Sequence, residues 1–245
     1  QRKGITYQEA CDLLRNPESL GVLMVDNYDV NDFLTGFHVK YSDSLRPALQ
    51  ILGTNNSLNH LAGMNIVRTK QGTFFFADTT VNVRPEGRTI ADTALLAANQ
   101  IRKFDIEPRI ALLSYSNFGS VREGSPVRVR EAVEILHRDY PDLVVDGELQ
   151  ANYAFNKELR MKKFPFSKLA DRDVNTLIFP NLSAGNIAFK MMQEIGEAEV
   201  IGPILMGLRK PVQIIQMESS VRDIVNMTAI AVLDAQSASD EIVQF

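Results

Sequence analysis

One polar loop near the middle of the chain carries side chains suited to binding an anionic ligand. The segment SYSNFGSVREGS (114–125) offers the hydroxyls of Ser114, Ser116 and Ser120, the open backbone of Gly119 and the positive charge of Arg122. It follows an apolar run and precedes a helical pattern, so backbone N–H groups and the helix dipole could hold a phosphate there. A solvated turn with capping serines is the alternative. The loop is neither a Walker A motif nor a GxGxxG fingerprint.

Two other residues have side chains that could act on an anion or a reacting group. Arg46 precedes Pro47 at a predicted helix start, where its guanidinium could bind an anion bidentately. A surface ion pair is the alternative for this arginine. Asp146 follows an apolar run and could serve as an acid, a base or an orienting group. An Asp in that position can also simply cap a helix.

The sequence lacks the patterns of metal sites and of serine nucleophiles. His38, His60 and His137 are scattered without HExxH or H-x3-H spacing, so no metal site is indicated. No GxSxG elbow marks a nucleophilic serine. A single cysteine, Cys11, cannot form an intramolecular disulfide, and it fits a reduced, cytoplasmic setting.

Composition restricts the class of protein. Of the 245 residues, 45% are hydrophobic and 23% are charged, which is typical of a water-soluble globular protein. The net charge of −4 leaves no basic excess to neutralise a phosphate backbone, so nucleic-acid binding is not expected. The sequence contains no run of 18 apolar residues, so it predicts no membrane-spanning helix. Because the chain starts at Gln1 without an initiator Met, we expect it to be part of a longer protein.

The elements that position these residues alternate between helical and strand-like patterns. Short apolar runs followed by polar loops and helices predict an α/β fold with a parallel sheet covered on both faces. Helices are predicted over 7–15, 44–51 (with Ser44 as N-cap and Pro47 in the first turn), 88–104, 127–136, 184–195 and 220–235, and strands over 20–25, 73–77, 109–115, 143–146, 176–179 and 200–204.

Ligands bind outside the carboxyl ends of strands in such sheets. The polar loops expected at those ends are 78–80, 114–125, 146–148 and 181–186. Composition alone predicts that the chain passes between domains within 55–63 and near 202–203, with approximate boundaries.

Five motifs in order resemble those of phosphotransacetylases (phosphate acetyltransferases), and they extend over nearly the whole chain. The resemblance implies two α/β domains with a cleft between them. Residues 1–57 and 205–245 would build the first domain, truncated at its N-terminus, and 58–204 the second. The motifs are LRPALQI (45–51), SYS followed by GS (114–120), DGELQ (146–150), FPNLSAGN (179–186) and GPILMGLRKPV (202–212).

The segments ADTTVN (77–82), SYSNFGS (114–120) and SVRDIVNMTAIAVLDAQ (220–236) look most like the C-terminal phosphotransacetylase-like domain of large bacterial NADP-dependent malic enzymes. That resemblance implies a parent chain that oxidatively decarboxylates malate to pyruvate. NADP and a divalent metal would be bound only in the preceding malic-enzyme region, and this domain would need no cofactor. The resemblance also implies a cytoplasmic homo-oligomer, at least a dimer.

The sequence departs from the family pattern at positions that serve catalysis in active members. Active members have a KPVNDLSRG segment whose Ser and Arg serve acetyl transfer, and these two positions are Gln216 and Met217 here. Methionine carries no charge to stabilise an anionic transition state. Arg46 and Asp223 match family residues, whereas a second family arginine would lie before Gln1. The resemblance therefore implies a domain without catalytic residues.

The leading hypothesis is a regulatory domain that binds acetyl-CoA, or CoA, in its cleft and acts on the malic-enzyme region of the same chain. An active enzyme that moves acetyl between CoA and phosphate is one alternative, and an oligomerisation scaffold without a ligand is another. The residues that the resemblance assigns to acetyl-CoA are Arg46, Ser114, Ser116, Asn117, Gly119, Ser120, Arg122, Asp146, Gly202, Pro203, Met206 and Asp223.

Overall fold

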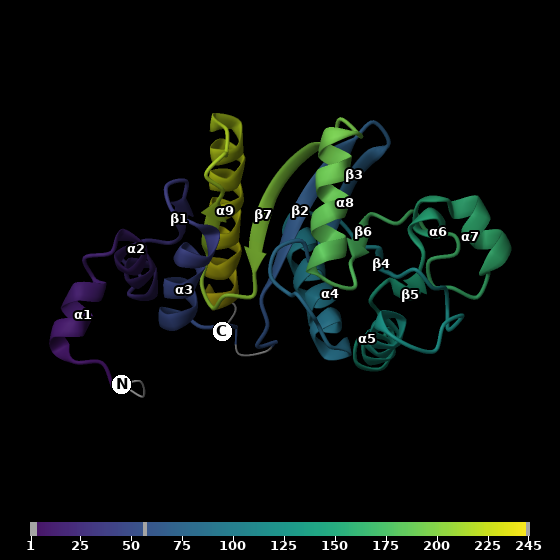
Figure 1. Ribbon diagram of the computed structural model, residues 1–245, viewed down its shortest axis with the longest axis horizontal. Coiled ribbons are helices and arrows are strands. Elements are labelled where there is room, and N and C mark those ends of the chain that lie inside the picture. Colours follow the sequence, from purple (N-terminus) through teal and green to yellow (C-terminus); the bar gives the residue numbers. More distant parts are fainter. Residues whose placement is uncertain (1–3, 56–57, 244–245) are drawn as a thin grey trace. The chain divides into compact units, whose positions relative to one another are not determined.

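The computed structural model describes residues 4–55 and 58–243, the last six of these as backbone only (Figure 1). The chain divides into two compact units. One comprises Gln1–Asn59 and Gly207–Phe245, and the other is His60–Met206. The family resemblance implied crossings after residues 57 and 204.

The discontinuous unit is built on a pair of parallel strands. Strands β1 and β8 pair in parallel, with Phe33 opposite Val212, and helices α2, α3 and α9 contact them. Val22, Ala48, Leu52 and Val212 form the buried cluster of this unit. The elements are α1 (Tyr7–Leu13), α2 (Pro17–Asp26), β1 (Phe33–Gly36), α3 (Tyr41–Ile51), β8 (Val212–Ile215) and α9 (Val221–Val243).

The strand predicted over 20–25 is wrong, because this segment belongs to α2. The Asn16 side chain accepts a hydrogen bond from the Ser19 backbone N–H at 3.0 Å, and Pro17 occupies the first turn. An Asn N-cap followed by Pro in the first turn starts a helix here. On the helix, Val22 and Val25 face the interior.

The start of α3 is also corrected. The helix begins at Tyr41 after Lys40, whose side chain makes no capping hydrogen bond. Ser44 is buried inside the helix rather than at its N-cap, and Pro47 lies beyond the first turn. Lys40 at the true start is not a residue type that favours N-caps, whereas Ser44 is, and so the start was predicted too late.

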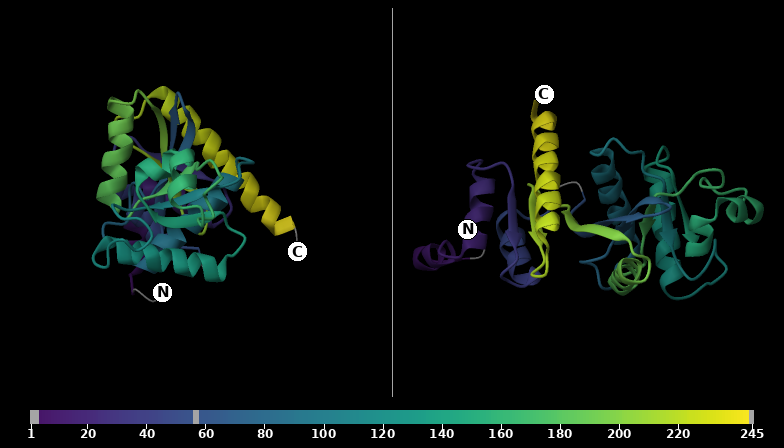
Figure 2. Two further views of the ribbon diagram at one scale, coloured as in Figure 1. Left: turned by 90° about the vertical axis from the view of Figure 1, so that its right-hand side faces the viewer. Right: turned by 90° about the horizontal axis from the view of Figure 1, so that it is seen from above.

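The continuous unit is built on a mixed six-stranded sheet of order β5-β4-β6-β3-β2-β7. Neighbours from β5 to β3 are parallel, whereas β2 is antiparallel to both β3 and β7. Helices α4 and α8 lie on opposite faces of the sheet (Figure 2). The elements are β2 (Ala62–Thr69), β3 (Gly72–Ala77), α4 (Gly87–Arg102), β4 (Ile110–Leu113), α5 (Ser125–Asp139), β5 (Val145–Leu149), α6 (Ala151–Phe155), α7 (Lys157–Lys163), β6 (Thr176–Ile178), α8 (Leu182–Glu194) and β7 (Glu199–Met206).

The predicted α/β fold class is confirmed, and the sheet is rich in parallel pairs. The sequence analysis did not predict β2, whose tight connection to β3 makes the antiparallel pair. It also did not predict β1, β8, α6 or α7. Strand β8 reads VQII, and its buried Gln213 interrupts the apolar run that would have marked a strand.

Candidate ligand-binding site

Three polar loops meet at one edge of the continuous unit. Strands β4, β6 and β3 are adjacent and parallel, so their carboxyl ends lie together. The loops that leave these ends are 78–86, 114–124 and 179–181. This edge is where an α/β sheet offers space for a ligand.

The loop after β4 is organised around Glu148, a fully buried carboxylate of β5. Glu148 Oε1 accepts from Ser116 Oγ at 2.6 Å and from the Gly119 N–H at 3.0 Å, and Arg130 Nη1 lies 3.3 Å away. The hydroxyls of Ser116 and Ser120 are 2.9 Å apart. The chain's own carboxylate thus occupies the donors that the sequence analysis offered to a phosphate.

The remaining predicted residues of this loop differ in their surroundings. Ser114 Oγ accepts from the Ser116 N–H at 3.3 Å, and Asn117 Oδ1 accepts from the Gln150 N–H at 2.9 Å. Arg122 is exposed and pairs with no carboxylate among the described residues. Arg122 is therefore the group of this loop best placed to meet an anion from solution.

Asp146 holds a neighbouring segment in place. Its Oδ2 accepts from Ser167 Oγ at 2.7 Å and from the Lys168 N–H at 2.8 Å, and Oδ1 accepts from the Gly147 N–H at 2.9 Å. The predicted loop at 146–148 is wrong, because β5 continues to Leu149. Two carboxylates can lie inside a buried strand when each has hydrogen-bond donors, and Asp146 caps no helix.

The loop after β3 follows a path that Asp78 fixes. Asp78 Oδ1 accepts from the N–H groups of Gly63, Thr80 and Val81 at 2.8–3.1 Å, and Oδ2 accepts from the Asn82 N–H at 2.6 Å. Asp78 is buried, so these hydrogen bonds replace water around its carboxylate. The next residues of the chain are thereby directed toward the carboxyl end of β6.

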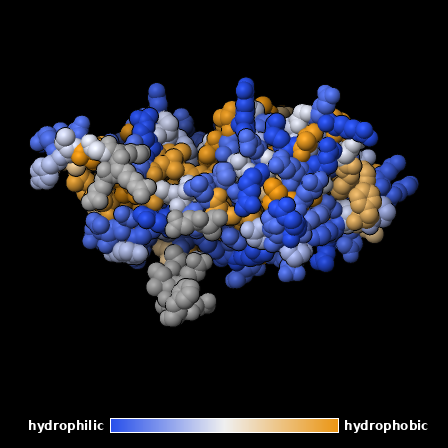
Figure 3. Space-filling model, turned by 90° about the horizontal axis from the view of Figure 1, so that it is seen from below, coloured by the Kyte–Doolittle hydropathy of each residue, from blue (hydrophilic) through white to orange (hydrophobic). Residues whose placement is uncertain are grey.

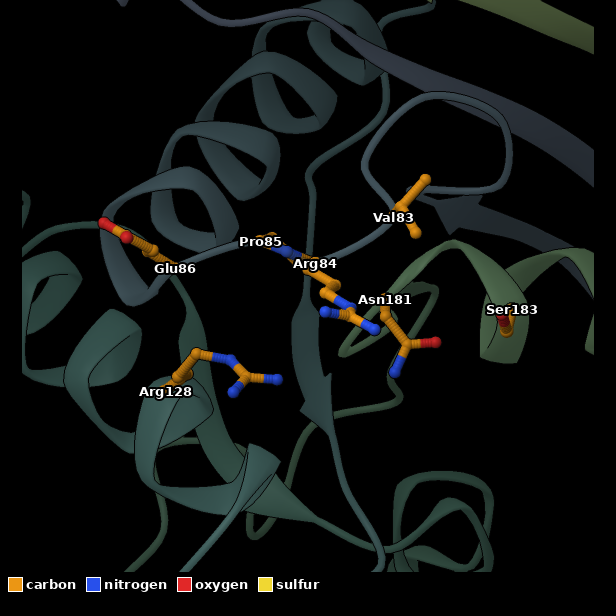
Figure 4. Close-up of a pocket in the computed structure, with 7 residues that line it drawn as sticks. All are labelled: Val83, Arg84, Pro85, Glu86, Arg128, Asn181 and Ser183. Carbon is orange, nitrogen blue, oxygen red and sulfur yellow. The ribbon is translucent and has the colours of Figure 1, made fainter.

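A pocket of about 730 Å³ lies beside these loops, within the continuous unit (Figure 4). It combines residues that follow β3, the first turns of α5 and the start of α8. Asn181 and Ser183 fall in a loop that the sequence analysis singled out, but Arg84 and Arg128 were missed. Neither arginine belongs to a recognisable motif, so only the folded chain brings them together. The lining residues are Val83, Arg84, Pro85, Glu86, Arg128, Asn181 and Ser183.

The predicted residues on β7 have structural surroundings. A Cβ atom at Gly202 would lie 2.9 Å from the Met64 carbonyl oxygen, and its φ of +128° favours glycine. Gly202 and Pro203 are joined by a cis peptide bond, and Met206 is buried. These features explain the three residues without a ligand.

Two predicted residues belong to the discontinuous unit. Arg46 lies on α3, is exposed, and pairs with no acidic group of the described chain. Asp223 forms a capping box at the start of α9: its Oδ2 accepts from the Ser220 N–H and Oγ, both at 2.8 Å, while Ser220 Oγ accepts from the Asp223 N–H at 3.2 Å. Asp223 therefore stabilises a helix start.

The loop after β8 presents the two substituted positions. Gln216 is exposed, and its backbone N–H donates to Ser219 Oγ at 3.1 Å. The Met217 side chain next to it is 53% exposed. Neither side chain brings a charge to this loop.

The described part of the chain has neither a cluster of metal-binding side chains nor a helix able to span a membrane. No group of three or more His, Cys, Asp or Glu side chains in the described chain is placed to hold a metal ion. Every helix of the described ranges is too short or too polar to cross a bilayer. The face drawn in Figure 3 exposes hydrophobic residues among hydrophilic ones.

Comparison with known proteins assigns the class of protein. The sequence profile of the family "Phosphate acetyl/butaryl transferase" matches residues 1–232. A phosphotransacetylase from Streptococcus pyogenes has a TM-score of 0.91 to this structure at 36% sequence identity, covering 96% of this chain and 72% of that one. The chain therefore belongs to the phosphate acetyl/butaryl transferase family. The resemblance drawn from the motifs is confirmed.

Two kinds of relative match the chain about equally well. The NADP-dependent malic enzyme of Escherichia coli is 35% identical over 97% of this chain, which spans 31% of that protein's length. The phosphate acetyltransferase of Bacillus subtilis is 34% identical over 96% of this chain, which spans 73% of that protein.

Proposed function

We propose that this chain is a catalytically inactive, phosphotransacetylase-like regulatory domain that binds acetyl-CoA as an allosteric effector. The observation that carries the proposal is the loop after β8, where Gln216 and the 53% exposed Met217 stand in place of the family's Ser and Arg. Without a cation at this position, the charge that develops during acetyl transfer has no counterpart. A loss of about 10³-fold or more in rate is expected from such a change.

The proposed parent protein is an NADP-dependent malic enzyme. In support, the chain aligns along almost its full length with part of a malic enzyme from Escherichia coli. The parent would oxidatively decarboxylate malate to pyruvate, with NADP and a divalent metal in its malic-enzyme region. The free thiol Cys11 agrees with a cytoplasmic setting.

Two exposed arginines support an anionic effector. Arg46 and Arg122 have no acidic partner in the described part of the chain, so both are available to the phosphates of acetyl-CoA. Ser116, Gly119 and Ser120 serve this proposal by shaping the loop rather than by contacting the ligand. Regulation requires that acetyl-CoA bind two conformations of the protein with different affinity.

A homo-oligomer, at least a dimer, is part of the proposal. Ile187 and Met191 on α8 and Ile195 at its C-cap lie four residues apart, and each is more than half exposed. A row of this kind on one helix face is typical of a surface that another chain covers.

An active phosphate acetyltransferase is the second candidate. The observation that favours it is the equally good match to the Bacillus subtilis phosphate acetyltransferase, of which this chain spans 73%. Under this alternative, Arg46, Asp146 and Asp223 would have to support acetyl transfer without the family's Ser and Arg.

Calorimetric titration of acetyl-CoA, together with a phosphate-dependent acetyl-transfer assay on the same sample, separates the candidates. We expect saturable binding without turnover. We also expect Arg46→Ala and Arg122→Ala each to weaken binding by about tenfold, as for a lost charged hydrogen bond. Arg138→Ala is the matched control, since Arg138 is exposed and already paired with Asp139.

Each other outcome selects another function. Turnover by the unchanged chain would establish the transferase and end the claim of inactivity. Absence of both binding and turnover would leave the oligomerisation scaffold. The double variant Gln216→Ser with Met217→Arg adds a positive arm, because a gain of turnover would assign the inactivity to these two positions.

A further inference from the structure

The pocket beside α5 and α8 presents hydrogen-bond donors without matching acceptors. In Figure 4, the guanidinium groups of Arg84 and Arg128 and the side-chain amide of Asn181 point into the same space. The Glu86 carboxylate, which also borders the pocket, points away from it. The centre of the pocket therefore carries positive charge that no side chain lining it neutralises.

Neither arginine is satisfied by the chain itself. Within the described residues, Arg84 and Arg128 form no ion pair or hydrogen bond, and Arg128 Nε is buried without a partner. A buried N–H that lost its water and gained no acceptor is costly, so it indicates a missing partner. Other arginines in this unit have partners: Arg88 is 3.0 Å from Asp92, and Arg109 and Arg138 also pair.

The Asn181 amide is oriented by the helix that it caps. Its Oδ1 accepts from the Ala184 N–H at 3.0 Å, which fixes the oxygen toward α8 and leaves the NH₂ group as a donor. The amide nitrogen lies on the side of the two arginines in Figure 4. The N-terminal turn of α8 adds the positive end of its dipole.

The size and walls of the pocket restrict what could fill it. Two guanidiniums can each bind a separate anionic group bidentately, and phosphate matches their planar geometry. A volume of about 730 Å³ exceeds what one inorganic anion needs, and Val83 and Pro85 add apolar wall. A phosphate chain attached to a larger organic group fits these features together.

We infer that the Arg84–Arg128 pocket binds the diphosphate group of a small molecule. The inference goes beyond the proposed function, because it concerns a pocket formed by the continuous unit alone. Both a free nucleoside diphosphate and CoA carry such a group. The experiment therefore tests the shared chemistry first and the source second.

The test is calorimetric titration of inorganic pyrophosphate and of orthophosphate into the chain, at a fixed potassium chloride concentration that screens diffuse attraction. Pyrophosphate is expected to bind one site at least about tenfold more tightly than orthophosphate, since it can engage both arginines. Arg84→Gln and Arg128→Gln are each expected to weaken pyrophosphate binding by about tenfold or more. Arg138→Gln removes the same charge elsewhere and is expected to leave binding unchanged.

The inference is overturned if pyrophosphate does not bind, if it binds no better than orthophosphate, or if the two pocket variants bind it like the control. A second arm titrates acetyl-CoA and ADP with and without saturating pyrophosphate. Displacement of acetyl-CoA identifies CoA as the source, and displacement of ADP alone identifies a nucleotide. Failure of acetyl-CoA to bind anywhere counts against the proposed function only.

Discussion

Two neighbouring regions of the continuous unit treat their charges in opposite ways. Around Glu148, a fully buried carboxylate is surrounded by a hydroxyl, a backbone N–H and Arg130. In the pocket beside α8, Arg84 and Arg128 point at the same space without an acceptor among the described residues. Glu148 Oε1 finds donors and a cation within the chain, although Oε2 has no hydrogen-bond partner in the described chain, whereas the two pocket arginines find no acceptor or carboxylate there.

This difference distinguishes charged residues that support the fold from charged residues that are available to bind a ligand. A buried charge whose partners lie within the chain is part of the scaffold, and removing it should destabilise the fold. A charge without partners contributes little to folding, and its removal should instead affect a ligand. Residue type alone does not distinguish the two, since a polar loop rich in serine turned out to belong to the first class.

The largest effect is expected for Glu148→Ala. The change removes the acceptor of Ser116 and Gly119 and leaves Arg130 beside an empty, buried position. Breaking such a pair costs about 3–5 kcal/mol of unfolding free energy. Urea denaturation measures it, with Glu123→Ala in the exposed part of the same loop expected to stay within about 0.5 kcal/mol. A small change for Glu148→Ala would show that this carboxylate does not organise the loop.

Removing a buried cation whose partners lie within the chain should also lower the free energy of unfolding, but by less than Glu148→Ala does. Arg160 is fully buried and donates to the backbone carbonyls of Leu169, Tyr153, Ala154 and Arg172. Arg160→Met keeps most of the side-chain volume but leaves these carbonyls without a donor. The expected loss of unfolding free energy is about 3 kcal/mol after local relaxation. Lys162→Met, on the exposed side of α7, is the control for denaturation. Equal stability of the two variants would contradict the view that buried charges with partners in the chain stabilise the fold.

Part of the fold could be predicted from the sequence, and the features of the fold and site that were missed have physical reasons. The buried strands that precede polar loops, such as 73–77 and 176–179, were predicted because apolar runs of this length report burial directly. Helix α2 was misassigned because Asn16 and Pro17 can end one helix and start the next. The pairing of Ser116 with Glu148, 32 residues apart, and the meeting of Arg84 with Arg128 depend on tertiary contacts that no local pattern contains.

A partly buried carboxylate in the other unit, Asp32, is expected to have a smaller, pH-dependent effect on stability. Partial burial, and then the charge of Asp234, raises the pKa of Asp32 in the folded state. The folded protein therefore holds this proton more tightly than the unfolded chain, so stability falls as pH rises from the ordinary pKa of 3.8 through the raised pKa of the folded state. Asp32→Asn should stabilise the protein at pH 8, by less than about 1 kcal/mol for a partly exposed group, and less so at pH 4.

Thermal unfolding at the two pH values measures the difference. Asp29→Asn, an exposed neighbour, serves as the control. A stabilisation by Asp32→Asn that is the same at both pH values would show that the charge of Asp32 is not its cause.

The smallest effect on the free energy of unfolding is expected for Arg84→Gln. Because Arg84 has no partner in the described chain, its loss should change unfolding free energy by less than about 0.5 kcal/mol, or stabilise slightly by relieving repulsion with Arg128. Pyrophosphate at about 100 times its Kd should stabilise the unchanged chain by about 2.7 kcal/mol. A variant that binds tenfold more weakly should gain only about 1.4 kcal/mol under the same conditions. A large loss of stability without ligand would place Arg84 in the class of Glu148, as part of the scaffold, and the contrast between the two regions would disappear.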